Sequence, residues 1–150
     1  MALIQPGRDA PPVADVDFSF GPTAVLFYKV TCPVCQMAAP KVRTFEEAYP
    51  GRIVGVGQDP EPALSSFSRE YAMDIPSVAD APPYDTSNAY GIESVPSLLL
   101  VGTDGVVVDA VESWDRVGFN RVSAHLAELT GATYKPISEE GDGLPPFRPG

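Results

Sequence analysis

The chain has 150 residues and a net charge of −10 at pH 7, and 44% of its residues are hydrophobic. A chain of this length forms one domain and can bury about 70% of its unfolded surface without disulfide staples. The strong negative charge argues against nucleic acids and anionic membrane surfaces as partners, because both would repel the protein.

The first twenty residues, MALIQPGRDAPPVADVDFSF, are rich in proline and aspartate. They predict an extended lead-in over residues 1–20 that ends in a short strand at Val16–Phe20. This stretch lacks the basic start and the continuous apolar run of a signal peptide. The longest clean apolar run of the chain, SLLLVG, is too short to cross a bilayer. We therefore expect a cytoplasmic protein without membrane contact.

Strands and helices alternate along the next hundred residues. Apolar runs of strand length are typical of buried strands, and an Asp-Gly pair between two β-rich runs predicts an antiparallel hairpin. The expected elements are strands at Ala24–Val30, 52–58 and 75–80, helices at about Val34–Ala48, 59–72 and 85–91, a hairpin at 97–113, and a last helix at about Arg116–Leu129.

The ends of these helices carry recognisable residues. Pro33 stands at a first helical position, where its missing N–H costs nothing. Pro40 lies inside the same helix and should kink it. Asp59 is the expected N-cap of the second helix. In the last helix, Val117, Val122, Leu126 and Leu129 are expected on one apolar side.

This order of elements predicts an α/β domain over residues 21–131. Strands that alternate with helices imply a mainly parallel sheet covered on both faces, here finished by an antiparallel hairpin. Residues 132–150 have little to bury, so we expect a flexible C-terminal tail.

The only two cysteines of the chain lie three positions apart, in KVTCPVCQMAAP, where the first buried strand meets a helix. The amides and the dipole at a helix N-terminus favour an anion, so the pKa of Cys32 should fall into the range of about 3.5–7.5. Cys35 lies one turn further in and should be less exposed and able to attack a mixed disulfide formed at Cys32. Such an exchange needs no cofactor beyond the Cys32–Cys35 disulfide itself.

Two other uses of this spacing are less favoured. A zinc site usually takes four protein ligands, whereas the chain offers two cysteines and His125, a single histidine in a predicted helix. A structural disulfide here would close too short a loop to add much stability. We therefore favour redox chemistry and expect no metal.

The pair CPVC after a buried strand, Pro40 in the next helix, and YGIESVPSLLLV before an Asp-Gly hairpin resemble thioredoxin over about Ala24–Gly131. The inserted segment VGQDPEPALSSFSREYAMDIPSVAD and the lead-in GRDAPPV resemble the TlpA-type, peroxiredoxin-like branch of that superfamily. The resemblance implies a thioredoxin-like fold, with a central mixed sheet, flanking helices, an extra helix–strand insertion and a C-terminal antiparallel hairpin.

The resemblance also implies roles for particular residues. Cys32 would be the nucleophile and Cys35 the resolving thiol, both catalytic. Pro96 would be a cis-proline, and Val95 would offer its N–H and C=O to an extended substrate segment. The substrate-docking rim would include Thr31, Pro33 and Val34, together with Val30. The implied partners are protein disulfides and an electron donor of the thioredoxin-reductase type, and we expect a monomer.

The chain departs from thioredoxin at two positions. Thr31 stands where thioredoxins have a tryptophan before the first cysteine, and Leu26 stands where they have a buried acid that helps to deprotonate the resolving thiol. Lys29 is a candidate replacement by proximity in sequence only. The proton acceptor and the reduction potential therefore stay open.

Three functions remain in competition. The first is a thiol–disulfide oxidoreductase, which we expect to act as a reductant. The second is a thiol peroxidase, but peroxiredoxins use Pro-x-x-x-Thr-x-x-Cys. Counting back from Cys32 places Lys29 at the threonine position and Val25 at the proline position. Counting back from Cys35 places Cys32 and Tyr28 there, so neither cysteine fits the motif. The third is a non-catalytic adaptor of the same fold.

Overall fold

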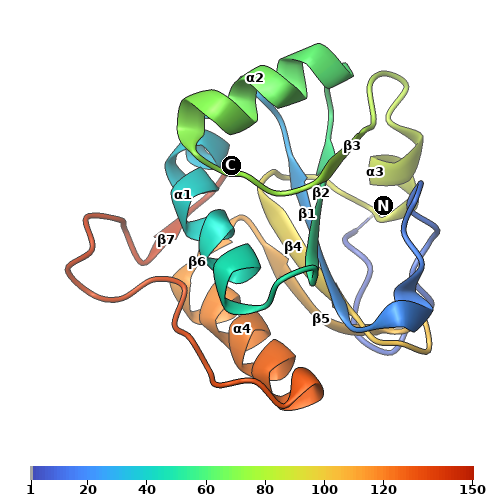
Figure 1. Ribbon diagram of the computed structural model, residues 1–150. Coiled ribbons are helices and arrows are strands. Elements are labelled where there is room, and N and C mark those ends of the chain that lie inside the picture. The colour runs from blue at the N-terminus through green and yellow to red at the C-terminus, as the bar shows by residue number, and fades with distance from the viewer. Residues whose placement is uncertain (1) are drawn as a thin grey trace.

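A computed structural model describes residues 2–150 and contains a five-stranded sheet in the order β3-β2-β1-β4-β5 (Figure 1). A separate pair, β6 and β7, lies outside this sheet. The strands are β1 Thr23–Tyr28, β2 Ile53–Gly57, β3 Ser77–Ala79, β4 Ser97–Val101, β5 Val107–Glu112, β6 Trp114–Asp115 and β7 Phe147–Arg148. The helices are the 3-10 turn η1 Phe18–Phe20 and the α-helices α1 Pro33–Ala48, α2 Glu61–Tyr71, α3 Asp85–Ala89 and α4 Arg116–Thr130.

The central strand β1 is buried along its whole length. It pairs in parallel with β2, where Ala24 lies opposite Ile53, and antiparallel with β4, where Leu26 lies opposite Leu98. A run of apolar residues without alternation suits a strand that is covered on both faces. β4 and β5 form the antiparallel hairpin that the Asp-Gly turn predicts. The predicted mixed sheet with flanking helices is therefore confirmed.

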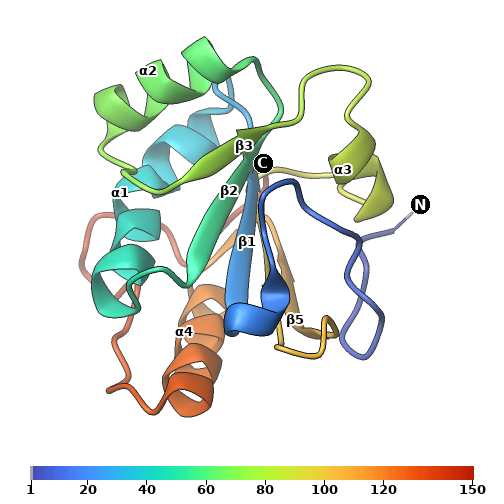
Figure 2. The ribbon, with the colours of Figure 1, turned by 45° about the vertical axis from the view of Figure 1, so that its right-hand side comes forward.

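The two faces of the sheet are covered differently, as Figure 2 shows. Leu26 points into a core that α1, α2 and α4 close, whereas Phe27 points into a second core that includes Leu3 and Tyr90. Successive side chains of a strand point to opposite faces, which explains why β1 serves both cores. Among residues 2–150, none of the helices combines the length and the apolar character that crossing a membrane requires.

The lead-in is not merely an extended arm. The N–H of Ile4 donates to the Tyr90 carbonyl at 3.0 Å, and Val13 is 4% exposed. The strand expected at Val16–Phe20 is wrong, because this stretch forms η1. The Asp17 side chain accepts a hydrogen bond from the N–H of Ser19, a local contact that favours a turn over a strand.

Two expectations about helices are also wrong. Asp59 does not cap α2, whose N-cap is Pro60 without a side-chain hydrogen bond. In α4, Val122 is fully buried but Val117 is 71% exposed. Five residues turn a helix through about 140° beyond one full circle, so these two valines lie on different sides. Leu129, in the last turn, is 50% exposed.

The segment over residues 132–150 packs against the domain, so the expectation that it has little to bury is wrong. Ile137 and Ser138 are each 2% exposed. Further on, β7 pairs antiparallel with β6, and the Trp114 Nε1–H donates to the Pro145 carbonyl at 2.8 Å. Most of these contacts are polar and join residues far apart in sequence, which is why hydrophobic periodicity does not reveal them.

Candidate active site

The two cysteines lie at the start of α1, directly after β1. Pro33 is the first helical residue, as predicted, and Cys32 is the N-cap. The N–H of Cys35 donates to Cys32 Sγ at 3.2 Å. A sulfur in the N-cap position thus takes the place of the hydroxyl or carboxylate oxygen that usually satisfies an unpaired N–H there. Both thiols are free.

The surroundings of Cys32 stabilise its thiolate. A hydrogen bond from the Cys35 thiol is the largest cause that lowers the pKa of Cys32, to about 6. The backbone amides of Cys35 and Val34 and the positive charge of Arg148 act in the same direction, whereas burial opposes them. At neutral pH Cys32 is therefore mostly a thiolate, the form that attacks disulfides.

Cys35 has the opposite environment. It is 3% exposed, and burial is the main cause that raises its pKa above the ordinary value for a thiol. Its hydrogen bond to Cys32 raises the pKa further, since that bond needs the Cys35 proton. Two thiols three residues apart thus differ in charge and in access.

The loop before β4 brings its backbone to Cys32. The Val95–Pro96 peptide bond is cis, as is Pro82–Pro83. When it is protonated, the Cys32 thiol donates to the Val95 carbonyl at 3.4 Å. Pro96 is buried and Val95 is half-buried. The structure therefore brings the two cysteines next to Val95 and Pro96, although at least 60 positions of sequence separate Cys35 from Val95.

The expected docking rim is only partly accessible. Thr31 and Pro33 are exposed, and Val30 is half-buried. Val34 is 5% exposed and packs in the core with α1, so it offers a partner very little surface. The helical repeat explains this, because Val34 lies on the same side of α1 as the buried Ala38.

Asp59 holds the segment that precedes Cys32, a role that we did not expect. Its carboxylate accepts the N–H of Val30 at 2.9 Å and lies 3.9 Å from the Lys29 ammonium. Lys29 also lies over the Tyr84 ring, 5.4 Å from its centroid. The Gln36 side chain donates to the Val30 carbonyl at 2.9 Å. Both backbone groups of Val30 are thus fixed by side chains from elsewhere in the chain.

Neither candidate position for a proton acceptor provides a free base. Leu26 is 2% exposed and contributes only apolar surface. Lys29 is engaged by Asp59 and Tyr84. Within the described part of the chain, no three His, Cys, Asp or Glu side chains are grouped so that they could hold a metal ion.

Two residues of the C-terminal segment reach this site, and no signal in the sequence pointed to them. Arg148 Nη1 lies 4.0 Å from Met37 Sδ, and the charge of Arg148 lowers the pKa of Cys32. Gly150 lies against the Val95 carbonyl, so closely that a Cβ on Gly150 would collide with its oxygen. They could not be found because their contacts depend on the path of residues 132–150.

The sheet order, the dithiol at the start of α1 and the adjoining Val95–Pro96 loop define a protein of the thioredoxin-like class. The chain belongs to the AhpC/TSA family, whose model matches residues 10–110. The resemblance inferred from CPVC and YGIESVPSLLLV is therefore confirmed at the level of the superfamily. No curated protein sequence matches the chain significantly.

Several solved structures are similar in fold. MTB dsbF, described in mixed oxidised and reduced forms, is 26% identical, with a TM-score of 0.61 over 71% of this chain and 81% of that one. The thioredoxin domain of a Bacteroides vulgatus thiol-disulfide oxidoreductase is 21% identical, with a TM-score of 0.69 over 82% and 99%. A secreted Mycobacterium tuberculosis disulfide oxidoreductase is 21% identical, with a TM-score of 0.60 over 73% and 82%.

Proposed function

We propose that this protein is a thiol–disulfide oxidoreductase that reduces disulfides in protein substrates. The observation that carries the proposal is the contrast between its two thiols. Cys32 lies at a helix N-terminus beside the Val95 carbonyl and has a lowered pKa, while Cys35 is buried one turn away and keeps its proton. The family and the similar structures support chemistry of this kind.

The reaction consists of two exchanges. The Cys32 thiolate attacks one sulfur of the substrate disulfide, so that a Cys32–substrate disulfide forms and the other substrate sulfur leaves as a thiolate and takes up a proton. Cys35 then loses its proton and attacks Cys32 Sγ. The mixed disulfide breaks, the second substrate thiol leaves with a proton, and the Cys32–Cys35 disulfide forms. Two electrons have passed from the protein to the substrate.

The remaining parts of the proposal concern the partners. An extended substrate segment would lie along Val95, hydrogen-bonded through its backbone, with Thr31 and Pro33 at the exposed edge. A donor of the thioredoxin-reductase type would return two electrons to the disulfide, and Cys35 would take up one proton, so that the Cys32 thiolate and the Cys35 thiol form again. The monomeric state, the cytoplasmic location and the absence of any cofactor or membrane partner stay predictions.

The test uses a variant that stops the reaction halfway. Cys35→Ser should retain attack by Cys32 but not resolution, so it should accumulate mixed disulfides with protein substrates that dithiothreitol releases. Cys32→Ser is the matched control and should trap nothing. Insulin reduction should be lost in both variants, because each removes one of the two exchanges.

The same variants separate the competing functions. An adaptor would bind partners through contacts that persist in Cys32→Ser and ignore dithiothreitol. A peroxidase would consume hydrogen peroxide much faster than it reduces insulin. If Cys35→Ser forms only complexes that are indifferent to reductant, the oxidoreductase proposal is wrong.

A further inference from the structure

The last residues of the chain return to the thiol site. In both ribbon views the C-terminus lies beside the end of β1 and the start of α1, although β7 begins far from them in sequence (Figures 1 and 2). Gly150 abuts the Val95 carbonyl, and a Cβ on Gly150 would also come within 3.2 Å of Pro96 N. The Val95 carbonyl is the group that lies next to Cys32 Sγ.

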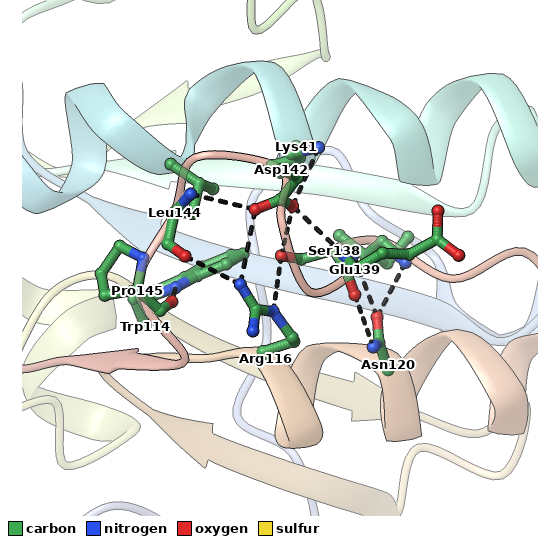
Figure 3. Close-up of polar contacts among 10 residues, drawn as sticks. Lys41, Trp114, Arg116, Asn120, Ser138, Glu139, Asp142, Leu144 and Pro145 are labelled. Atoms are coloured by element: carbon green, nitrogen blue, oxygen red, sulfur yellow. Dashed lines mark hydrogen bonds and ion pairs between the residues drawn. The ribbon is translucent and has the colours of Figure 1, made fainter.

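Residues up to Pro145 are anchored firmly. Asp142 lies 3.1 Å from the Lys41 ammonium on α1 and accepts from Ser138 Oγ at 2.6 Å (Figure 3). Arg116 Nη2 donates to the Leu144 carbonyl at 2.8 Å, and the indole N–H of Trp114 donates to the Pro145 carbonyl. These contacts join the segment to α1, to β6 and to the start of α4.

Residues beyond Pro145 are held lightly by comparison. The Arg116 N–H donates to the Pro146 carbonyl at 2.9 Å, and β7 is a strand of only two residues. Phe147 is 54% exposed, and residues 146–150 are all exposed. A two-residue strand with little apolar burial is released at small cost, since most of the stability of such elements comes from packing.

We infer that residues 147–150 are an internal occupant of the substrate-docking surface, and that a protein disulfide must displace them from Val95 before it can react with Cys32. This inference rests on the proposed function, because it takes the Val95 backbone as the place where a substrate segment lies. The end of the tail reaches that place with Gly150, a residue without a side chain, which follows the strand β7 by two positions. Because the chain stays anchored up to Pro145, residues 147–150 remain near Val95 after they are displaced. They can bind there again when the substrate leaves.

Competition of this kind has a measurable consequence. The apparent affinity for a ligand is reduced by the fraction of molecules that are competent to bind it. A tail that is docked in about nine molecules of ten would raise the KM for a protein substrate about tenfold. A small aromatic disulfide does not need the Val95 backbone and should reach Cys32 in either state.

Two variants should release the tail in different ways. Deletion of residues 147–150 removes the occupant but keeps the anchors up to Pro145, and Gly150→Ala adds the Cβ that collides with the Val95 carbonyl. Because the deletion also removes Arg148, both substrates are assayed at pH 8, well above the pKa of Cys32 of about 6. With insulin, we expect both variants to lower KM several-fold with little change in kcat. With 5,5′-dithiobis(2-nitrobenzoic acid), the rate at pH 8 should change less than twofold. Equal changes for both substrates, or an unchanged insulin KM, would overturn the inference.

Two controls separate release of the tail from other effects. Glu140→Ala changes an exposed tail position before the anchors of Leu144 and Pro145, and it should behave as the unaltered protein. Arg148→Gln removes the charge near Cys32 but leaves the backbone of β7 in place. It should slow both substrates alike below pH 6, because it makes the thiolate less stable, and it should leave the insulin KM high.

A peptide added in trans distinguishes failure of this inference from failure of the proposed function. The peptide PPFRPG should inhibit insulin reduction by the deletion variant competitively, and it should restore the backbone amide NMR signal of Val95 to its position in the full chain. If no form reduces insulin but the peptide restores the signal, the proposed function fails and docking of the tail stands. If insulin is reduced but the peptide neither inhibits nor shifts Val95, the inference fails alone.

Discussion

The two segments that meet at Cys32 are held in the fold in opposite ways. The β1–α1 segment contributes side chains to the cores on both faces of the sheet. Phe27 in one core and Phe45 in the other are fully buried. The C-terminal segment over residues 132–150 buries few apolar groups and is tied down by hydrogen bonds and charges around Asp142. The first segment fixes the position of Cys32. In the second segment Ile137 belongs to the core, and only residues 146–150, which are all exposed, can leave without disturbing it.

The largest difference between the two segments should appear in Phe45→Ala and Phe147→Ala. Phe45 is fully buried and its ring lies 6.2 Å from that of Phe119, so its loss should lower the free energy of unfolding by about 3–5 kcal/mol. Phe147 is 54% exposed, so loss of its side chain should change the free energy of unfolding by less than about 0.5 kcal/mol. Urea unfolding of the two variants checks this, and equal costs would mean that the tail belongs to the core.

The same contrast explains what the sequence could reveal. The apolar run AVLFYKV, Pro33 after Cys32 and the Asp104-Gly105 pair are local signals, and each led to the correct strand, helix start or hairpin. The position of Cys32 and Cys35 at the start of the helix was predicted from the same local signals. Pro96 was found only through the resemblance of YGIESVPSLLLV to thioredoxin, because nothing local brings it to the thiols.

What was missed depends on contacts between distant residues. Asp59 was taken for a helix cap, and its bond to the N–H of Val30 depends on the neighbouring ends of β1 and β2. Ile137 is a single apolar residue in a polar stretch, so no periodicity marks it as buried. Arg148 and Gly150 reach the site only because Ile137 and Asp142 direct the chain there. A pattern of residues does not encode such a path.

Ile137→Ala tests whether the tail unfolds together with the domain. Ile137 is 2% exposed, and removal of a buried isoleucine side chain costs about 2–5 kcal/mol. We expect a value near the lower limit, because the surrounding segment can move toward the space that is left. Hydrogen exchange of the Trp114 indole N–H should accelerate at the same time. A change in stability below about 0.5 kcal/mol would show that the tail opens independently of the core.

The two thiols predict how the stability of the reduced protein depends on pH. The pKa of Cys32 is about 6 in the folded protein and about 8.5 in an unfolded chain, so the unfolded state binds more protons between these values. Stability should therefore rise from pH 6 to pH 8.5. Above about pH 8.5 Cys35 has the opposite effect. Burial raises its pKa, so the folded state then holds a proton that the unfolded state loses, and stability falls as the pH rises. Urea unfolding of the reduced protein and of reduced Cys32→Ser between pH 6 and pH 8.5 measures this rise in stability. If stability rises equally with pH in both proteins, the lowered pKa does not belong to Cys32.

Ser138→Ala should lower the free energy of unfolding less than Phe45→Ala or Ile137→Ala does. Ser138 Oγ accepts from Arg116 Nε at 3.0 Å and donates to Asp142, so the loss should cost about 1 kcal/mol at neutral pH. The hydrogen bond from Ser138 is also the largest cause that holds the pKa of Asp142 below its usual range, followed by the Leu144 N–H.

The acid dependence of Ser138→Ala follows from that lowered pKa. A carboxyl with a lowered folded pKa contributes stability above its unfolded value, about 3.9, and loses it as the pH falls. The stability difference between Ser138→Ala and the unaltered protein should therefore be full at pH 7 and shrink below about pH 4. Urea unfolding between pH 3 and pH 7 measures this difference. A difference that is constant over the range would mean that Ser138 supports Arg116 alone and that the charge of Asp142 does not hold the tail.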